Sequence, residues 1–277
     1  MPAAESTPFE LRLHGGAPER RYRKLRPGVS ELPWDSIDPE GLSAAGFSAT
    51  ELAAARGGWT SAALQEYASA SAQASLLRAL VRARVPLDLS GMAAGFPLDE
   101  LVHAELCARM AEVLGGGTGV PCGDRYFPSP PNRDDPLLEA AELVVWNCCV
   151  SESWSTAMLR EVQKRAQSEL AVAIWGQIAK DETLHGQFGW VFLDWLEQEI
   201  DGGLGASDRL ALARTASRVV HSIRQNIAQM AKAAPAQFCA IGVLPGFDPE
   251  SFQACATAAL ERVVLAPLRA HRILPDA

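Results

Sequence analysis

The amino-acid sequence predicts an all-α protein: a four-helix bundle with one long crossover, an N-terminal arm and two appended C-terminal helices. Long segments with apolar residues at helical spacing end at Pro or Gly clusters, and no stretch alternates apolar and polar residues for long, as a strand would. Residues 116–135 are rich in Gly and Pro, which indicates a long crossover. The 277 residues, 48% of them hydrophobic, suffice for one large core.

The first half of the chain contains the arm and two predicted helices. Residues 1–57 combine Pro, Gly and charge with little periodicity, so we expect an arm that lies over the domain. A helix is expected from about 60 to 84, where a Val-Pro pair stops it. A second helix is expected from about 88 to 114, with a kink at Pro97 and an end at three consecutive glycines.

The second half contains four predicted helices. Two long ones, at about 136–165 and 168–200, are separated by almost nothing, so we expect antiparallel neighbours. Two amphipathic ones follow at about 207–233 and 249–271, on either side of a Pro-Gly turn. The chain therefore divides into three predicted parts: an arm at 1–57, the bundle at 58–201 and a helical extension at 202–277.

Charge and cysteine usage narrow the class of function. A net charge of −8 and a pI near 5.2 lack the basic surface that phosphate backbones require, so nucleic acid is not an expected partner. No apolar run reaches membrane-spanning length and the first sixteen residues do not resemble a signal peptide, so we expect no membrane association. Six cysteines without a CxxC pair fit reduced thiols, which favours the cytoplasm.

The pattern Asp-Glu-x-x-His occurs twice, at residues 99–103 in the second predicted helix and at 181–185 in the fourth. At 100° per residue, positions three apart lie on one helix face, so the Glu and His of each copy can grip one ion. A single Glu-x-x-His arises by chance in many proteins, and two copies with carboxylate partners are far more specific. The two pairs are Glu100 with His103 and Glu182 with His185.

A further carboxylate is available one helix upstream of each copy. Glu66 is the one acid in the first predicted helix. Four glutamates compete in the third helix, and Glu152 fits best because it lies about as far from the turn as Glu182, so antiparallel helices bring the two level. Glu66 precedes Glu152 by 86 residues and Glu100 precedes Glu182 by 82, which indicates a pseudo-twofold internal repeat.

A Glu from each of two helices and Glu-x-x-His from each of two others is the ligand set of ferritin-like di-iron and di-manganese proteins. On these residues, the segment from about 59 to 200 resembles the ferritin-like superfamily, which includes bacterial multicomponent monooxygenases, ribonucleotide reductase small subunits, acyl carrier protein desaturases, p-aminobenzoate N-oxygenases and rubrerythrins. The resemblance implies a ferritin-like bundle and six metal ligands: Glu66, Glu100, His103, Glu152, Glu182 and His185. It also implies that Glu100 and Glu182 bridge the metals, and that Asp99 and Asp181 accept an imidazole N–H.

The resemblance implies an oxidase or oxygenase with two Fe ions, or Mn in their place, that acts on dioxygen and a small-molecule substrate. An external electron donor is expected, and a homodimer is among the expected assemblies. Small residues within one turn of Glu66 and Glu152 are expected to leave room beside the metals: Ala62, Ala63, Ser69, Ala70, Cys148, Cys149, Ser155 and Thr156. Thr156, one turn after Glu152, matches the place of a catalytic hydroxyl in this family; the alternative is that it bonds back to the Glu152 carbonyl.

Three other functions compete with the oxygenase. Ferroxidase or iron storage uses the same ligands, although this chain adds an arm, a crossover and C-terminal helices that can cover a pocket. A di-manganese catalase stays open because ligand type does not separate iron from manganese. A rubrerythrin-like peroxidase is disfavoured because the chain has no CxxC pair for a second iron site. A metal-free network would leave several buried charges uncompensated.

Overall fold

A computed structural model describes residues 7–25, 27–38, 42, 46–127, 133–199 and 204–274, and it confirms the all-α class. Within those residues, the extended structure is one antiparallel pair, β1 (Thr7–Pro8) with β2 (Pro121–Cys122). Part of the predicted crossover, 128–132, and the predicted link at 201–203 lie outside the described residues. None of the described helices is both long and apolar enough to span a bilayer.

The first long helix, α3 (Ala49–Arg82), begins well before the predicted start near residue 60. Its N-terminal cap explains the difference. The Ser48 hydroxyl accepts a hydrogen bond from the Glu51 N–H at 3.2 Å, and the Glu51 carboxylate accepts one from the Ser48 N–H at 2.9 Å. This capping box stabilises an early start and offsets Gly57 and Gly58, which each disfavour a helix by about 1 kcal/mol.

The predicted second helix is in fact two helices, α4 (Leu87–Ala93) and α5 (Phe96–Val113). The chain breaks at Ala94 and Gly95, so the kink predicted inside one helix is wrong. Pro97 lies in the first turn of α5, where its missing N–H costs no helical hydrogen bond and its fixed φ suits the helix. The proline therefore begins the helix that carries the first Asp-Glu-x-x-His motif.

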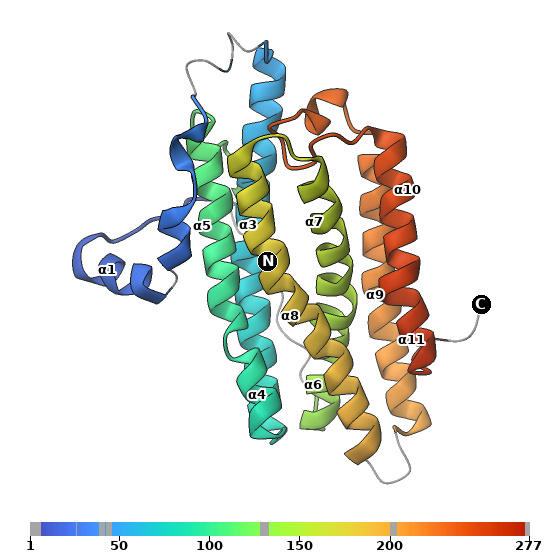
Figure 1. Cartoon of the computed structure of the whole chain (residues 1–277). Helices are drawn as coiled ribbons and strands as arrows, with labels where there is room; N and C mark the ends of the chain where they lie inside the picture. The colour runs from blue at the N-terminus through green and yellow to red at the C-terminus, as the bar shows by residue number, and fades with distance from the viewer. Residues whose placement is uncertain are drawn as a thin grey trace.

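The third and fourth long segments have the predicted bounds, but the third is not a uniform α-helix. It comprises α6 (Pro136–Val144), the π-helix η4 (Val145–Glu152) and α7 (Ser153–Arg165). The fourth is α8 (Glu169–Glu199). π-helices are rare and are frequently found at functional sites, and this one ends on Glu152. In Figure 1, α3 packs along α5, and α7 packs along α8.

The C-terminal segment packs beside η4 and α7 (Figure 1). It contains α9 (Ala206–Met230), η5 (Pro235–Phe238), α10 (Pro249–Leu260), η6 (Glu261–Leu265) and α11 (Ala266–Ala270). Two tryptophans fasten this segment to the bundle. Trp59 donates its indole N–H to the Ile241 carbonyl at 2.9 Å, and Trp154 donates to the Ala256 carbonyl at 3.1 Å.

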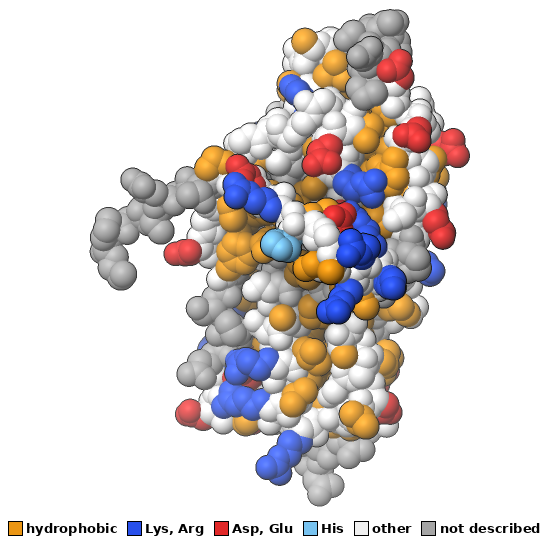
Figure 2. Space-filling view, turned by 90° about the vertical axis from the view of Figure 1, so that its left-hand side faces the viewer, with side chains coloured by type: hydrophobic (Ala, Val, Ile, Leu, Met, Phe, Trp, Pro, Cys, Tyr) orange, Lys and Arg blue, Asp and Glu red, His pale blue; other side chains and the backbone are white. Residues whose placement is uncertain are grey.

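The segment before α3 lies against α5. It includes α1 (Gly16–Leu25), η1 (Pro27–Glu31) and η2 (Trp34–Ser36). Arg23 of α1 forms an ion pair with Glu105 of α5, and the Arg109 guanidinium lies 3.9 Å from the centre of the Trp34 ring. Figure 2 looks onto this side and shows basic, acidic and hydrophobic side chains interspersed. These contacts hold the segment to the outer face of α5.

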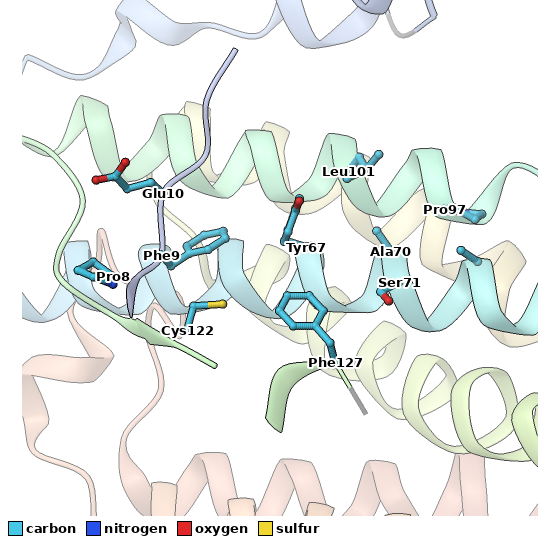
Figure 3. Close-up of a pocket in the computed structure, with 11 residues that line it drawn as sticks. Pro8, Phe9, Glu10, Tyr67, Ala70, Ser71, Pro97, Leu101, Cys122 and Phe127 are labelled. Carbon is cyan, nitrogen blue, oxygen red and sulfur yellow. The ribbon is translucent and has the colours of Figure 1, made fainter. Parts of the chain in front are cut away.

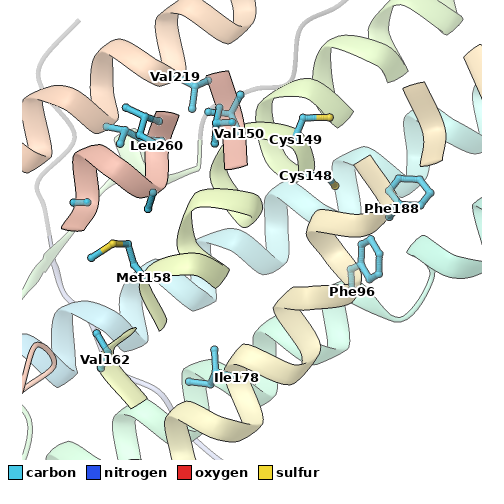
Figure 4. Packing of buried hydrophobic residues seen from close by; sticks show 14 of the residues in the cluster. Phe96, Cys148, Cys149, Val150, Met158, Val162, Ile178, Phe188, Val219 and Leu260 are labelled. Carbon is cyan, nitrogen blue, oxygen red and sulfur yellow. The ribbon is translucent and has the colours of Figure 1, made fainter. Parts of the chain in front are cut away.

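Buried apolar side chains from the bundle and the C-terminal helices form one core (Figure 4). Phe96 and Phe188 meet edge to face, with 5.6 Å between ring centres. Gly189 of α8 allows η4 to approach closely: a β-carbon there would lie 2.8 Å from Cys149 Sγ and 2.9 Å from Cys148 Cβ. The π-helix and α8 can therefore touch only because Gly189 has no side chain.

We expect Gly189→Ala to lower the free energy of unfolding by about 1–3 kcal/mol, because the added methyl overpacks the contact between α8 and η4. Gly91→Ala is the matched control: no atom lies within 4 Å of its β-carbon position in α4, so a gain of about 0.5–1 kcal/mol is expected. Urea unfolding followed by circular dichroism measures both. Equal stability of the two variants would contradict the close contact.

Candidate metal centre

The structure brings the six predicted ligand residues together. They form two groups of four, and within each group one donor atom per residue lies within 4.8 Å of the others. The first group is Glu66, Glu100, His103 and Glu182; the second is Glu100, Glu152, Glu182 and His185. Each group thus contains three carboxylates and one imidazole, and two of the glutamates belong to both groups.

The long helices each supply one part of the centre. Glu66 comes from α3, the first motif from α5, Glu152 from the end of η4, and the second motif from α8. Five of the six side chains are buried. The exception is Glu66, whose side chain remains 19% exposed. The centre is therefore closed except at Glu66.

Both histidines direct Nδ1 at the shared glutamates. His103 Nδ1 lies 3.1 Å from a Glu182 oxygen and 3.8 Å from oxygens of Glu66 and Glu100. His185 Nδ1 lies 2.9 Å from the other Glu182 oxygen and 3.3 Å from Glu100. The ring centres are 6.4 Å apart. Nδ1 is therefore the nitrogen that a metal between these residues would meet.

The Nε2 atoms point away from the glutamates, and each meets the aspartate of the other motif. His103 Nε2 lies 3.2 Å from Asp181 Oδ2, and His185 Nε2 lies 3.4 Å from Asp99 Oδ2. Gln177 donates a hydrogen bond to Asp181 at 2.8 Å. An aspartate on Nε2 favours the tautomer that leaves Nδ1 free to bind a cation. The pairing crosses between α5 and α8, so each helix orients the histidine of its neighbour.

Burial controls the ionisation of the centre. Burial raises the pKa of Glu66 to about 8, and it raises the pKa of Glu152 well above its usual range. For Glu182 burial has the same tendency, but hydrogen bonds from the two histidines outweigh it and hold the pKa below its usual range. The pKa of His185 rises to about 12, because hydrogen bonds to carboxylates outweigh the opposing effect of burial. Without metal, protons partly compensate the negative charge.

Other buried carboxylates of this protein have arginine partners, which those of the centre lack. Glu139, fully buried, accepts hydrogen bonds from two arginines at 2.8 and 2.5 Å. Glu142 pairs with Arg133 through two bonds of 2.7 Å. Among the described residues, no Lys or Arg forms an ion pair with the four glutamates of the centre, and both carboxylate oxygens of Glu100 lack a hydrogen-bond partner. Such a set can hold a metal ion, because a cation would supply the missing positive charge.

Two polar residues hold the third helix in place at the centre. Gln73, 1% exposed, donates to a Glu152 carboxylate oxygen at 2.9 Å. It was not predicted, although its position two turns after Glu66 on α3 is a usable signal. The Thr156 hydroxyl lies 2.7 Å from the Glu152 carbonyl and 3.0 Å from the Glu182 carbonyl. A hydroxyl has one proton, so these contacts favour the back-bonding alternative for Thr156 over the catalytic role.

A cavity of about 520 Å³ reaches the centre at Glu66. Its walls come mainly from α3, α7, α8 and the C-terminal segment. Of the small residues expected beside the metals, Ala62 and Ser155 line it, whereas Ala70 lines another cavity. A larger cavity, of about 710 Å³, lies over α3 and α5 between Tyr67, Leu101 and other side chains (Figure 3). None of the six candidate ligands lines this larger cavity. Of these two cavities, the smaller one is therefore the one that reaches the candidate metal centre.

Comparison with models of known protein families and with curated proteins finds no match for this chain. The chemistry of the centre therefore follows from its residues alone. Three features matter: a buried group of glutamates and histidines, the aspartates behind the histidines, and a cavity at the one partly exposed ligand.

The metal-free protein should lose stability as the pH rises from about 5 to 8. A carboxyl group whose pKa is higher in the fold than in the unfolded chain keeps its proton there, so the unfolded chain binds fewer protons and stability falls with rising pH. Glu66, with a pKa raised from 4.5 to about 8, contributes this slope, and the raised pKa of Glu152 contributes in the same direction. The raised pKa values of His103 and His185 also make stability fall with rising pH above pH 6.5.

Urea unfolding in a chelator at about pH 5, 6.5 and 8 measures this slope, and Glu66→Gln should flatten it. Metal binding displaces the same protons, so the affinity for a divalent cation should rise over this interval. Stability that increases from pH 5 to 8 would contradict the protonated state of the buried glutamates.

Gln73→Leu should weaken divalent metal binding by about 10–100-fold, because Glu152 loses the hydrogen bond that orients its carboxylate. Gln187→Leu, at an exposed position of α8, is the matched control and should bind metal like the wild type. Competition with a chromophoric chelator gives the affinities. Unchanged affinity in Gln73→Leu would show that the hydrogen bond does not position Glu152.

Proposed function

We propose that this chain is a non-haem di-iron oxidase or oxygenase, built on a ferritin-like four-helix bundle, that uses dioxygen to oxidise a small organic substrate. The observation that carries the proposal is that Glu100 and Glu182 belong to both donor groups. These two carboxylates lie between the Nδ1 atoms of His103 and His185, and this arrangement suits two adjacent cations better than a single cation. The complete set matches the ligand pattern of ferritin-like di-metal proteins.

In this proposal each of the two outer pairs would hold one iron ion, and the two shared glutamates would be available to both ions. Four carboxylates largely offset the charge of two divalent ions and leave coordination positions open. When bound, the iron pair supplies the redox and Lewis-acid chemistry that dioxygen activation needs. The pairs are Glu66 with His103 and Glu152 with His185, and the shared residues are Glu100 and Glu182.

The remaining residues of the centre position the ligands. The two aspartates hold each imidazole with Nδ1 facing inward, and Phe96, with its ring centre 4.1 Å from that of His185, keeps water from one side. We assign Thr156 a positioning role in place of the catalytic one. Its hydroxyl lies between the backbone carbonyls of Glu152 and Glu182 and can donate its one proton to either of them, so it lies at the contact between the third helix and α8.

The cavity at Glu66 supports an enzyme over a store, because ferroxidase or storage chemistry gives an apolar chamber beside the ligands no role. An oxygenase that places one oxygen atom in the substrate and releases the other as water needs two further electrons. An external electron donor therefore belongs to the proposal. A di-manganese catalase would use the same ligands without an organic substrate.

Anaerobic titration with Fe(II) should reach about two ions per chain. His103→Ala or His185→Ala should lower this number, whereas His221→Ala, at an exposed position of α9, should not. Metal analysis after gel filtration measures the stoichiometry. A wild-type value near zero would refute the metal centre, and uptake of tens of irons per chain under air would make storage the better function.

A further inference from the structure

We infer that the cavity at Glu66 selects an uncharged, largely apolar substrate, and that the C-terminal helices provide the selective wall. The link to catalysis rests on the proposed function, whereas the selectivity rests on the cavity alone. The cavity, of about 520 Å³, has the size of sites that enclose a small organic molecule.

The charge of the cavity excludes an anion. Of the described residues that line it, Glu66 is the one with a charged side chain, and no Lys or Arg is among them. A carboxylate or phosphate in this chamber would lose its hydration without gaining a partner. A cation would have Glu66 as its one counter-charge, and a bound metal takes that carboxylate in the proposed function. An uncharged molecule needs neither a cationic partner in the cavity nor the Glu66 carboxylate.

The walls favour a molecule with a ring or another flat apolar body. Trp154 of α7, Trp175 of α8 and Phe252 of α10 face the cavity together with aliphatic side chains. Aromatic walls bury large apolar areas and pack on rings. The exposed residues Asn226 and Gln237 also line the cavity, and their amides can bond to one hydroxyl, amine or carbonyl group.

The C-terminal segment contributes one side of this cavity, whereas most of the lining residues belong to α3 and α7. Asn226 and Met230 come from α9, Gln237 from η5 and Phe252 from α10, while α3 contributes the side next to Glu66. Hydrogen bonds from Trp59 and Trp154 to backbone carbonyls join the bundle to the C-terminal segment. The ligands of the centre thus lie in the bundle, whereas the C-terminal residues, together with Trp154 and Trp175 of the bundle, shape the cavity beside them.

The test compares 2-naphthalenemethanol with 2-naphthoate, which differ in charge but little in shape. Calorimetry on the full chain without metal should give one site for the alcohol and at least about tenfold weaker binding of the carboxylate. Asn226→Lys should improve binding of 2-naphthoate, because it places a cation at the cavity wall. Gln225→Lys, an exposed neighbour that does not line the cavity, is the control with the same charge.

A second pair of variants locates the bound molecule. Ala62→Phe fills the cavity one turn before Glu66 and should weaken alcohol binding by at least about tenfold. Ala74→Phe is the control, since Ala74 is an exposed residue of the same helix that lines the other cavity. Thermal unfolding of both variants verifies that they fold.

Tighter or equal binding of 2-naphthoate by the wild type, or equal effects of the two phenylalanine variants, would overturn the inference. Two iron ions per chain without any binding of the alcohol would reject the cavity and leave the di-iron centre intact. Binding of the alcohol by a protein that takes up no metal would reject the di-iron centre and leave the cavity inference intact.

Discussion

The constraint on which this structure depends is a cluster of four glutamates, three of them buried, without an arginine or lysine to neutralise them. Elsewhere in the described chain, buried acids such as Glu139 and Glu142 have arginine partners. At the centre, compensation comes from protons on Glu66, Glu152 and the two histidines, and a bound cation would replace those protons. Metal affinity, stability and pH dependence are therefore linked, because each depends on the same buried charge.

Each aspartate of the centre pairs with the histidine of the other helix, so the orientation of both imidazoles depends on how α5 and α8 are placed relative to each other. Asp99 on α5 orients His185 on α8, and Asp181 on α8 orients His103 on α5. A displacement of either helix would disturb both imidazoles at once. The close contact at Gly189 and the π-turns of η4 fix the third helix against α8 in the same region. Ligand geometry therefore depends on how closely the helix backbones approach.

The cavity beside the centre is built from different parts. It reaches the centre at Glu66, the one candidate ligand that keeps some exposure, and one of its sides belongs to C-terminal helices that contribute no candidate ligand. In the proposed function, this division separates the constraints on the metal centre from those on the cavity. Residues such as Asn226 and Phe252 line the cavity without belonging to either donor group, so a change at these positions would leave the donor groups intact.

The sequence by itself determined the all-α class, the bounds of the later helices and the six residues that meet, because helical periodicity and the doubled motif are local patterns. The sequence-based prediction placed the start of α3 too late and placed a kink at Pro97. Residues that can cap the start of a helix and residues that can end one lie within a few positions of each other, so local patterns do not decide between the two. Only the tertiary structure decided which aspartate faces which histidine, that Gln73 holds Glu152, and that the third helix widens into a π-helix. These features depend on distances between segments far apart in the chain, which no local pattern encodes.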